Sequence, residues 1–343
     1  MNPPDVLVVG GGPAGAAVAI GCAQRGRRVV LLEQKKFPRP KICGDVLNPN
    51  CWPVLERLGV AAAVRALPHH RITGVRFTTP GGGNLSFPVE AVAVRRSVFD
   101  ACLLDHARAA GVEVIEERWS PSHPSAAMVV GADGRHSAVA RATGLAQPQP
   151  PPVERIAFQS HFRIPPGLGD DVQLHLFPGG YCGLVRVDPV RLNLCIVTNR
   201  AGAQAHQDCP ELFRRTVWHN PQFRELGIAP EPLDPLQSAQ PLWTRPHTPA
   251  RDGVLLVGDA LRVVEPFTGQ GIFFALRTGE LAAELMEPVA YTHAVRALYQ
   301  QRARTNKLLR ELMYRPGLAD WVLPVLRRWP TGLQWLAGNV LAP

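Results

Sequence analysis

A glycine-rich stretch near the N-terminus constrains the fold more than any other part of the sequence. Residues 5–9 (Asp-Val-Leu-Val-Val) form an apolar run of the length of a buried strand, and three glycines follow with the spacing Gly-x-Gly-x-x-Gly: Gly10, Gly12 and Gly15. In the dinucleotide-binding fingerprint the first glycine permits a tight turn, the second lets a pyrophosphate approach the backbone, and the third lets helix pack on strand. Pro13 and Ala14 begin a helix whose free N–H groups can bind phosphate.

The residues after the fingerprint continue the pattern of a nucleotide-binding βαβ unit. A helix through Ala16–Arg25 ends at Gly26, a second apolar strand covers Arg28–Leu32, and Glu33 follows that strand. An acidic side chain about 20 residues after the glycines can accept hydrogen bonds from a ribose. This order predicts an α/β fold with a Rossmann-type domain rather than an ordinary strand-to-helix turn.

The composition of the chain limits the kinds of function that it can have. The 343 residues are 46% apolar, which allows about two domains, and the net charge of +9 comes mostly from arginine. This positive charge suits a phosphate-bearing cofactor or an anionic lipid surface, unless it only reflects arginine-rich usage. The chain lacks a basic run interleaved with aromatic residues, so the sequence does not indicate nucleic-acid binding. Seven cysteines without a Cys-x-x-Cys pair or a Cys/His cluster favour a cytoplasmic protein without a metal site. The sequence contains no run of 18 uncharged apolar residues, so it predicts no membrane-spanning helix.

The segment that follows Glu33 alternates between loop, helix and strand patterns. The expected elements are a long loop over residues 35–49, a helix over Trp52–Leu58, a hairpin of Arg71–Thr79 with Asn84–Val89, a helix over Arg96–Ala110 and a strand over Val112–Ile115.

Two later strands end beside an aspartate. Residues 128–131 lead into Ala132-Asp133-Gly134, and residues 253–257 lead into Gly258-Asp259. A glycine turn containing Gly269, Gly271 and Ile272 then opens a helix that continues to about Met286. These junctions can present carboxylates and free N–H groups to a polar ligand anchored at the fingerprint, although the first of them alone is equally typical of an ordinary turn.

A proline-rich connector at residues 147–152 predicts a change of domain near residue 150. Beyond it apolar residues alternate with a period of two, which predicts an antiparallel sheet with one face covered, suited to form the wall of a substrate pocket. The residues expected to share a face within each strand are Ile156, Phe158, Phe162 and Ile164; Val172, Leu174 and Leu176; and Leu192, Leu194 and Ile196.

Two arginine-bearing helices are expected at the end of the chain. The last segment, Leu318–Leu341, places three tryptophans beside two adjacent arginines: Trp321, Trp329, Trp335, Arg327 and Arg328. Such an amphipathic surface either makes peripheral contact with a membrane or packs over the body of the protein or the pocket mouth.

In these motifs the chain resembles the FAD-dependent oxidoreductases of the aromatic-hydroxylase type over roughly residues 5–285. Within them it is similar to the geranylgeranyl-reductase-like branch. The three FAD signatures occur in order: the fingerprint with Glu33, the Gly-Ala-Asp-Gly-x-x-Ser motif at Gly131–Ser137, and Gly258-Asp259. Two runs, Lys41–Leu47 and Pro266–Ile272, are similar to the branch's Lys-x-Cys-Gly-Asp/Glu-x-Leu and Pro-x-Thr-Gly-Glu-Gly-Ile.

The resemblance implies a domain plan and a role for each matched residue. The plan is an FAD-binding domain in two parts (1–150 and 249–288), an inserted antiparallel β-sheet substrate domain (151–248) and a C-terminal helical segment (289–343). The implied contacts are the pyrophosphate at Gly10, Gly12, Pro13, Ala14 and Gly15, the adenosine ribose at Glu33, FAD at Arg96, the pyrophosphate region at Asp133, the ribityl chain at Gly258 and Asp259, and the isoalloxazine ring at Gly269, Gly271 and Ile272.

The cysteine loop of this branch borders the flavin and the substrate, so Cys43 is the candidate catalytic residue, unless it is merely packed there. No second glycine fingerprint is present. NADH or NADPH is therefore expected to bind transiently at the surface, or a separate partner supplies the electrons.

The sequence also departs from relatives of this family. Gly180-Tyr181-Cys182-Gly183 lacks the usual tryptophan, residues 117–126 are too few for the longer β-meander, and Leu261-Arg262 replaces the Ala-His that follows Gly-Asp-Ala in hydroxylases. The halogenase pattern Trp-x-Trp-x-Ile-Pro is absent, which disfavours halogenation.

Three functions remain open. The first is hydride transfer from reduced flavin to a C=C bond of a hydrophobic, isoprenoid-like or polyene small molecule. The alternative is a flavin-dependent monooxygenase that hydroxylates an aromatic or polyketide-like ring, and the third is a non-catalytic flavin-binding protein.

Overall fold

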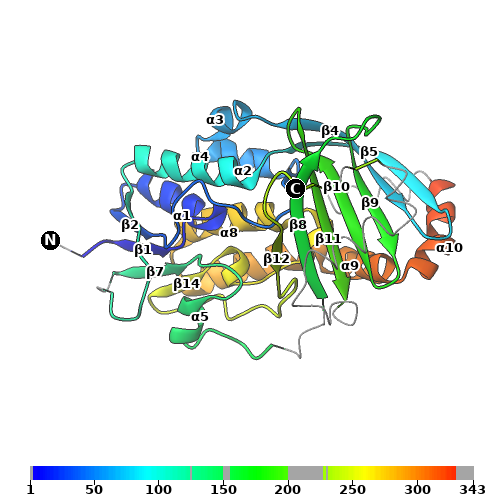
Figure 1. Cartoon of the computed structure of the whole chain (residues 1–343). Coiled ribbons are helices and arrows are strands. Elements are labelled where there is room, and N and C mark those ends of the chain that lie inside the picture. The colour runs from blue at the N-terminus through cyan, green and yellow to red at the C-terminus, as the bar shows by residue number, and fades with distance from the viewer. Residues whose placement is uncertain (1–2, 124–125, 150–154, 200–226, 229–230, 330–343) are drawn as a thin grey trace.

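The computed structural model describes residues 3–123, 126–149, 155–199, 227–228 and 231–329, and it contains two β-sheets that lie side by side (Figure 1). The first, called here the parallel sheet, has the order β13 (Ala250–Arg251), β14 (Val254–Leu256), β7 (Met128–Gly131), β1 (Val6–Val9), β2 (Val29–Leu32) and β6 (Glu113–Ile115). All neighbouring strands run parallel except β13, which pairs antiparallel with β14 at the edge. This doubly wound order confirms the predicted Rossmann-type fold.

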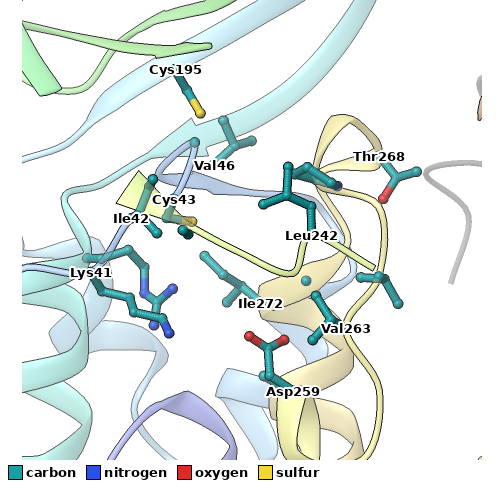
Figure 2. A pocket seen from close by; sticks show the side chains of 18 of the residues that line it. Lys41, Ile42, Cys43, Val46, Cys195, Leu242, Asp259, Val263, Thr268 and Ile272 are labelled. Atoms are coloured by element: carbon teal, nitrogen blue, oxygen red, sulfur yellow. The ribbon is translucent and has the colours of Figure 1, made fainter. Parts of the chain in front are cut away.

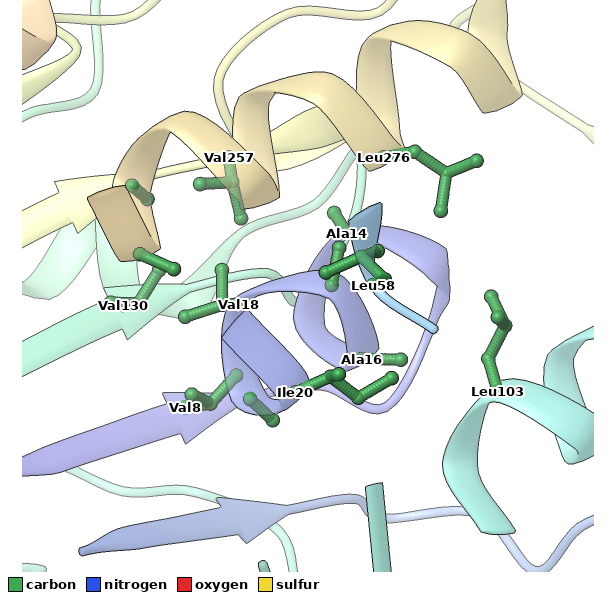
Figure 3. Packing of buried hydrophobic residues seen from close by; sticks show 14 of the residues in the cluster. Val8, Ala14, Ala16, Val18, Ile20, Leu58, Leu103, Val130, Val257 and Leu276 are labelled. Carbon is green, nitrogen blue, oxygen red and sulfur yellow. The ribbon is translucent and has the colours of Figure 1, made fainter. Parts of the chain in front are cut away.

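Helix α1 (Pro13–Ala23) lies in the centre of the first core. Its sequence is apolar on all sides, so it is buried between its neighbours, with α8 (Gly271–Leu285) on one side and α4 (Arg96–Ala109) on another (Figure 3). Small residues allow the close approach of α1 and α8: a Cβ added to Gly21 would lie 2.8 Å from Ala283 Cβ, and one added to Gly279 would overlap the carbonyl of Ala14. The helix stops two residues before the predicted Arg25, in a turn that Gly26 completes with φ +73°.

Most of the remaining local predictions agree with the structure, but the loop expected over residues 35–49 contains the two-residue strand β3 (Val46–Leu47). The predicted helix over 52–58 is α2 (Cys51–Arg57), directly followed by α3 (Ala61–Arg65). A short helix, α5 (Ala138–Ala142), follows β7, and single helical turns cover Gly258–Ala260 and Pro266–Thr268.

The second sheet, called here the mixed sheet, is larger than the sequence indicated. Its order is β12 (Gln237–Ala239), β8 (Arg155–Arg163), β11 (Arg191–Asn199), β10 (Gly180–Arg186), β9 (Asp171–Phe177), β4 (His70–Thr78), β5 (Asn84–Ala93) and β3 (Val46–Leu47). The predicted hairpin is β4–β5, and β4 pairs in parallel with β9. The sheet is therefore neither wholly antiparallel nor confined to residues 151–248. The pairing satisfies backbone groups that would otherwise be exposed at two strand edges.

Apolar side chains cover both faces of the mixed sheet, so the expectation of a single covered face was wrong. The outer face carries Ile156, Phe158, Phe162, Cys182, Leu184, Leu192, Leu194 and Ile196. The inner face carries Leu85, Ala157, Leu174, Leu176, Tyr181 and Val197. Alternation within each strand sends successive side chains to opposite faces, so two apolar sets interleave in one strand.

Two helices end the described chain. Helix α9 (Pro288–Tyr314) contacts β13 of the parallel sheet and β10 of the mixed sheet, and thereby connects the two. Helix α10 (Pro316–Arg327) packs on β5, at the far end of the mixed sheet (Figure 1). None of the described helices is both long and apolar enough to cross a membrane. The proline-rich residues 150–152 and Trp335 lie outside the described residues.

Candidate active site

A cavity of about 1420 Å³ extends from the glycine fingerprint to the inner face of the mixed sheet. Gly10, Gly12 and Glu33 line one end, Cys43 and Asp259 line the middle, and α9 and α10 contribute to the other end. Figure 2 shows the middle section, where Cys43 and Cys195 lie toward one side and Val263 and Asp259 toward the other, with Ile272 between them. The structure thus gathers residues from widely separated parts of the sequence around one space.

The fingerprint has the geometry that its glycines predict. Gly10 has φ +107°, and a Cβ added to Gly15 would overlap the carbonyl of Gly10. In contrast, a Cβ at Gly12 would meet only Arg39 Nη2, at 3.6 Å, so its backbone faces open space. Helix α1 has no side-chain cap and no acidic residue in its first turn. Its uncapped N–H groups therefore form an anion-binding end.

Glu33 lies at the end of β2, beside the fingerprint. It is only 6% exposed, and its carboxylate accepts hydrogen bonds from Gly11 N and Lys35 N, both at 2.8 Å. The guanidinium of Arg39 lies 3.9 Å away. These contacts fix the carboxylate beside the cavity, and its bond to a ribose stays a prediction.

The two later aspartates differ in their surroundings. Asp133 Oδ2 accepts hydrogen bonds from Ala138 N (2.6 Å) and Val139 N (3.2 Å), the first two N–H groups of α5, whose N-cap residue is Ser137. Its Oδ1 is buried and has no partner in the described part of the chain. Asp259 lines the cavity and lies 3.9 Å from Arg135 Nη2. Asp133 thus combines a structural role with a free acceptor, whereas Asp259 is available to a ligand.

Arg96 is buried at the start of α4 and lines the cavity. Its guanidinium donates two hydrogen bonds to Asp100, at 2.7 and 2.8 Å. Burial by itself would lower the pKa of Arg96, but the carboxylate of Asp100 outweighs it, so the pKa is raised and the side chain stays charged. Arg39 approaches the same carboxylate at 3.8 Å. Asp100 therefore holds two cations beside the predicted cofactor site.

The cysteine loop is attached to the mixed sheet by hydrogen bonds. Asn193 on β11 donates through Nδ2 to the carbonyl of Cys43 (2.8 Å) and to Asp45 Oδ2 (2.6 Å). Asp45 has φ +59°, and its Oδ1 accepts a hydrogen bond from Arg96 N at 3.1 Å. Burial raises the pKa of the Cys43 thiol, which favours its protonated form. Burial has the opposite effect on Lys41, because it disfavours the charged ammonium group and so lowers the pKa of this side chain.

The glycine turn before α8 completes this part of the wall. Gly269 has φ +62°, and its carbonyl accepts a hydrogen bond from Asn48 Nδ2 at 3.0 Å, which joins the turn to the cysteine loop. Gly271 and Ile272 line the cavity at the N-terminus of α8. Every site residue predicted from the sequence therefore lies on this one cavity, except Gly15 and Gly258, which lie behind its wall and allow close packing.

Sequence reasoning missed several polar residues of the site. Arg39 and Arg135 add positive charge to the cavity wall, and His161 supports the cysteine loop through Asp45. The two arginines adjoin motifs that were recognised, so their position was a usable signal. His161 on β8 and Asn193 on β11 lie in strands of alternating hydrophobicity and pair directly with each other. No sequence pattern indicates this pairing.

The residues present fit FAD. The uncapped helix end and the open backbone at Gly12 are suited to a diphosphate. The unpartnered Asp133 Oδ1 can accept a hydrogen bond from a hydroxyl group of the same elongated ligand. No described group of three or more His, Cys, Asp or Glu side chains is arranged to hold a metal ion.

Comparisons with known proteins agree with this geometry. The family model described as "FAD binding domain" matches residues 4–124. Menaquinone reductase from Mycolicibacterium smegmatis is 30% identical over 317 residues, covering 82% of this chain and 76% of that protein. Digeranylgeranylglycerophospholipid reductase 2 from Methanopyrus kandleri is 27% identical over 308 residues, with coverages of 82% and 76%.

Solved structures show the same fold at lower identity. A flavin-dependent brominase has a TM-score of 0.83 at 20% identity and covers 99% of this chain and 94% of its own. P. aeruginosa PqsL, in complex with 2-aminobenzoylacetate, has a TM-score of 0.75 at 20% identity, with coverages of 94% and 100%. The chain belongs to the FAD-dependent oxidoreductases of the geranylgeranyl-reductase-like family. It is an enzyme of this class.

Proposed function

We propose that this enzyme reduces a C=C bond in a long hydrocarbon chain, such as a polyprenyl group. The observation that carries the proposal is the apolar end of the cavity, called here the chamber, which lies between the mixed sheet, α9 and α10. Its lining includes Val75, Phe77, Leu85, Phe87, Leu174, Leu176, Tyr181, Leu242, Leu312, Met313, Leu323 and Leu326. In the described part of the chain, no charged side chain of the mixed sheet, α9 or α10 lines the chamber.

A chamber of this kind binds hydrocarbon by burial. Each CH₂ group removed from water contributes roughly 0.8 kcal/mol, so one five-carbon unit contributes about 4 kcal/mol at most. Tyr181, Phe267 and Tyr314 pack against one another with ring centroids 6.1–6.2 Å apart, and Tyr181 and Phe267 line the cavity. Tyr181 and Phe267 therefore add aromatic surface to the cavity wall.

Reduced FAD supplies the hydride when it is bound. The chain's own task is to hold the alkene, exclude water and provide a proton for the second carbon. Cys43 is suited to provide that proton, because burial keeps its Sγ protonated and the residue lines the cavity. The nearby charge of Arg96 would stabilise the resulting thiolate. We further propose NADH or NADPH as a transient reductant, drawn to the cations Arg39, Lys41 and Arg135.

Anaerobic turnover tests the proposed reaction. Protein reconstituted with FAD and reduced with dithionite would be mixed with menaquinone or a geranylgeranyl lipid in the absence of oxygen, and products analysed by mass spectrometry. We expect a product heavier by two hydrogens. A strict requirement for O₂, with a product heavier by one oxygen, would instead establish the monooxygenase. Reoxidation without any change in the tested lipids and phenols would favour the non-catalytic flavoprotein.

A further inference from the structure

Helix α10 presents an unusual concentration of exposed apolar side chains. Of the seven large apolar side chains that are exposed in the described residues, four lie on α10 or directly after it: Leu318 (42% exposed), Trp321 (81%), Val325 (62%) and Trp329 (59%). Their spacing of three and four residues places them along one strip of the helix surface. A contiguous strip of this kind is typical of an interaction surface rather than of scattered exposure.

The opposite side of the same helix forms the end of the chamber. Ala319, Leu323 and Leu326 line the cavity, and Ala319 and Leu323 pack with Leu85 and Met313. One helix therefore separates the chamber from the exposed strip. A hydrocarbon chain in the chamber would lie only one helix diameter, about 10 Å, from whatever covers that strip.

The charges around the strip indicate the kind of partner. Between residues 315 and 329 the chain carries three arginines and a single acid, Asp320. Arg327 and Arg328 are exposed and form no ion pair with any described residue, whereas Arg315 pairs with Glu311 at 3.2 Å. Tryptophans beside arginines suit the boundary between lipid headgroups and acyl chains, where an indole is partly buried and arginine meets anionic phosphate.

Asp320 attaches α10 to the hairpin below it. Its carboxylate accepts hydrogen bonds from Thr79 Oγ1 and from Gly81 N (3.2 Å), at the turn between β4 and β5. The single acid of the helix is thus turned towards the protein and bonded there. The outward side keeps its apolar and positive character.

From these observations we infer that α10 is a membrane-docking helix that rests on an anionic lipid bilayer and places the apolar end of the chamber against it. A hydrophobic substrate would then reach the chamber from the bilayer past α10. This inference concerns binding to lipid and does not depend on which reaction follows.

Vesicle co-sedimentation of the full-length FAD-loaded protein tests this inference. The probes are vesicles of phosphatidylcholine alone and of phosphatidylcholine with phosphatidylglycerol in equal parts. We expect binding to the anionic vesicles, and a loss of at least about tenfold in the double variant Trp321→Asp/Val325→Asp. Arg327→Gln and Arg328→Gln should each weaken binding about fivefold, and only to anionic vesicles, because each arginine contributes about one unit charge near the surface.

The chain provides a matched control for the apolar substitutions. Val289 is 64% exposed but lies in the first turn of α9, roughly 40 Å along that helix from the start of α10. Val289→Asp should bind vesicles like the wild type. Flavin absorbance and circular dichroism would establish that each variant is folded, and a double variant that failed to fold would be replaced by Trp321→Ser.

Three results would overturn the inference. The wild type could remain in the supernatant with both kinds of vesicle, or the α10 variants could bind as tightly as the wild type. Sedimentation velocity could also show a wild-type dimer that Trp321→Asp dissociates, which would assign the strip to a second copy of this chain. Anaerobic turnover of a short detergent-dispersed substrate remains measurable in all variants, so failure of lipid binding and failure of the proposed reaction are distinguishable.

Discussion

His161 Nε2 lies 2.8 Å from Asp45 Oδ2, and its Nδ1 lies 2.8 Å from Asp234 Oδ2. One imidazole therefore joins a carboxylate of the cysteine loop that is 2% exposed to a carboxylate near the surface. Burial by itself would lower the pKa of His161, but the two carboxylates outweigh it and the pKa is raised above 6.5.

This arrangement predicts a pH-dependent stability. A histidine whose pKa is raised in the folded state stabilises the fold fully below its unfolded pKa of about 6.5, and this contribution is lost as the pH rises through the folded pKa. We expect the free energy of unfolding in urea to fall as the pH rises above about 6.5, and His161→Asn to remove much of that slope. The exposed His69, changed to Asn, should leave the slope intact; an unchanged slope in His161→Asn would contradict the assignment.

Alanine at two different fingerprint glycines should affect two different properties, FAD affinity at Gly12 and stability of the fold at Gly15. Gly12→Ala places a methyl group in the open cavity, so the fold should be retained while FAD affinity falls by about tenfold or more. Gly15→Ala forces a methyl group onto the carbonyl of Gly10, so this variant should lose folded protein. Thermal unfolding and flavin absorbance measure the two effects separately. A Gly12→Ala protein that binds FAD normally would rule out close approach of the diphosphate there.

Removing the carboxylate of Asp259 should remove the cofactor. Asp259 lines the cavity and lies beside Arg135, so Asp259→Ala should purify without yellow colour but with normal circular dichroism. Asp252→Ala, in the exposed turn between β13 and β14, is the control and should remain yellow. Stoichiometric flavin in Asp259→Ala would show that this aspartate does not hold FAD.

Cys43 should be an unreactive thiol that matters for turnover. Because burial raises its pKa, alkylation by iodoacetamide should be slow at neutral pH and accelerate only above about pH 9. Cys43→Ala should lower kcat by roughly 100-fold with little change in flavin content, as expected for loss of a proton donor. Cys102→Ser, on the outer part of α4, serves as the control. Full activity of Cys43→Ala would reduce its role to packing.

Narrowing the chamber should change the preferred chain length. Leu326 lines the far end of the cavity and is only partly buried, so Leu326→Trp adds bulk there with little strain. We expect KM to rise for long polyprenyl substrates and to stay unchanged for short ones. Equal KM changes for both lengths would place the substrate tail elsewhere.

The sequence was most informative where the backbone alone determines the function. A positive φ or close packing requires glycine at Gly10, Gly15 and Gly269. Because only glycine fits such positions, they can be recognised from the sequence alone. The strand and helix patterns from Val6 to Leu32 likewise depend on local periodicity. These signals sufficed for the fold class and for the location of the predicted site residues around one cavity.

Long-range pairing was not accessible in the same way. The contact of β4 with β9 joins residues about 100 positions apart, and neither strand carries a signal that names its partner. Asn193 and His161 were missed for the same reason, because their chemistry depends on a cross-strand neighbour and on Asp45 from a distant loop. The hydrophobic faces of the mixed sheet were recognised strand by strand, but their assignment to two opposite faces required the register.

The parallel pairing of β4 with β9 has a consequence for engineering. The hairpin β4–β5 and the ribbon β8–β11 meet along this single line of backbone hydrogen bonds, while the glycine fingerprint lies in the other sheet. Residues 155–199 could therefore be exchanged for the corresponding ribbon of a related reductase, provided that the edge of β9 is retained together with His161 and Asn193, which hold the cysteine loop. A series of such chimaeras would vary substrate preference while leaving the nucleotide site of the host unaltered.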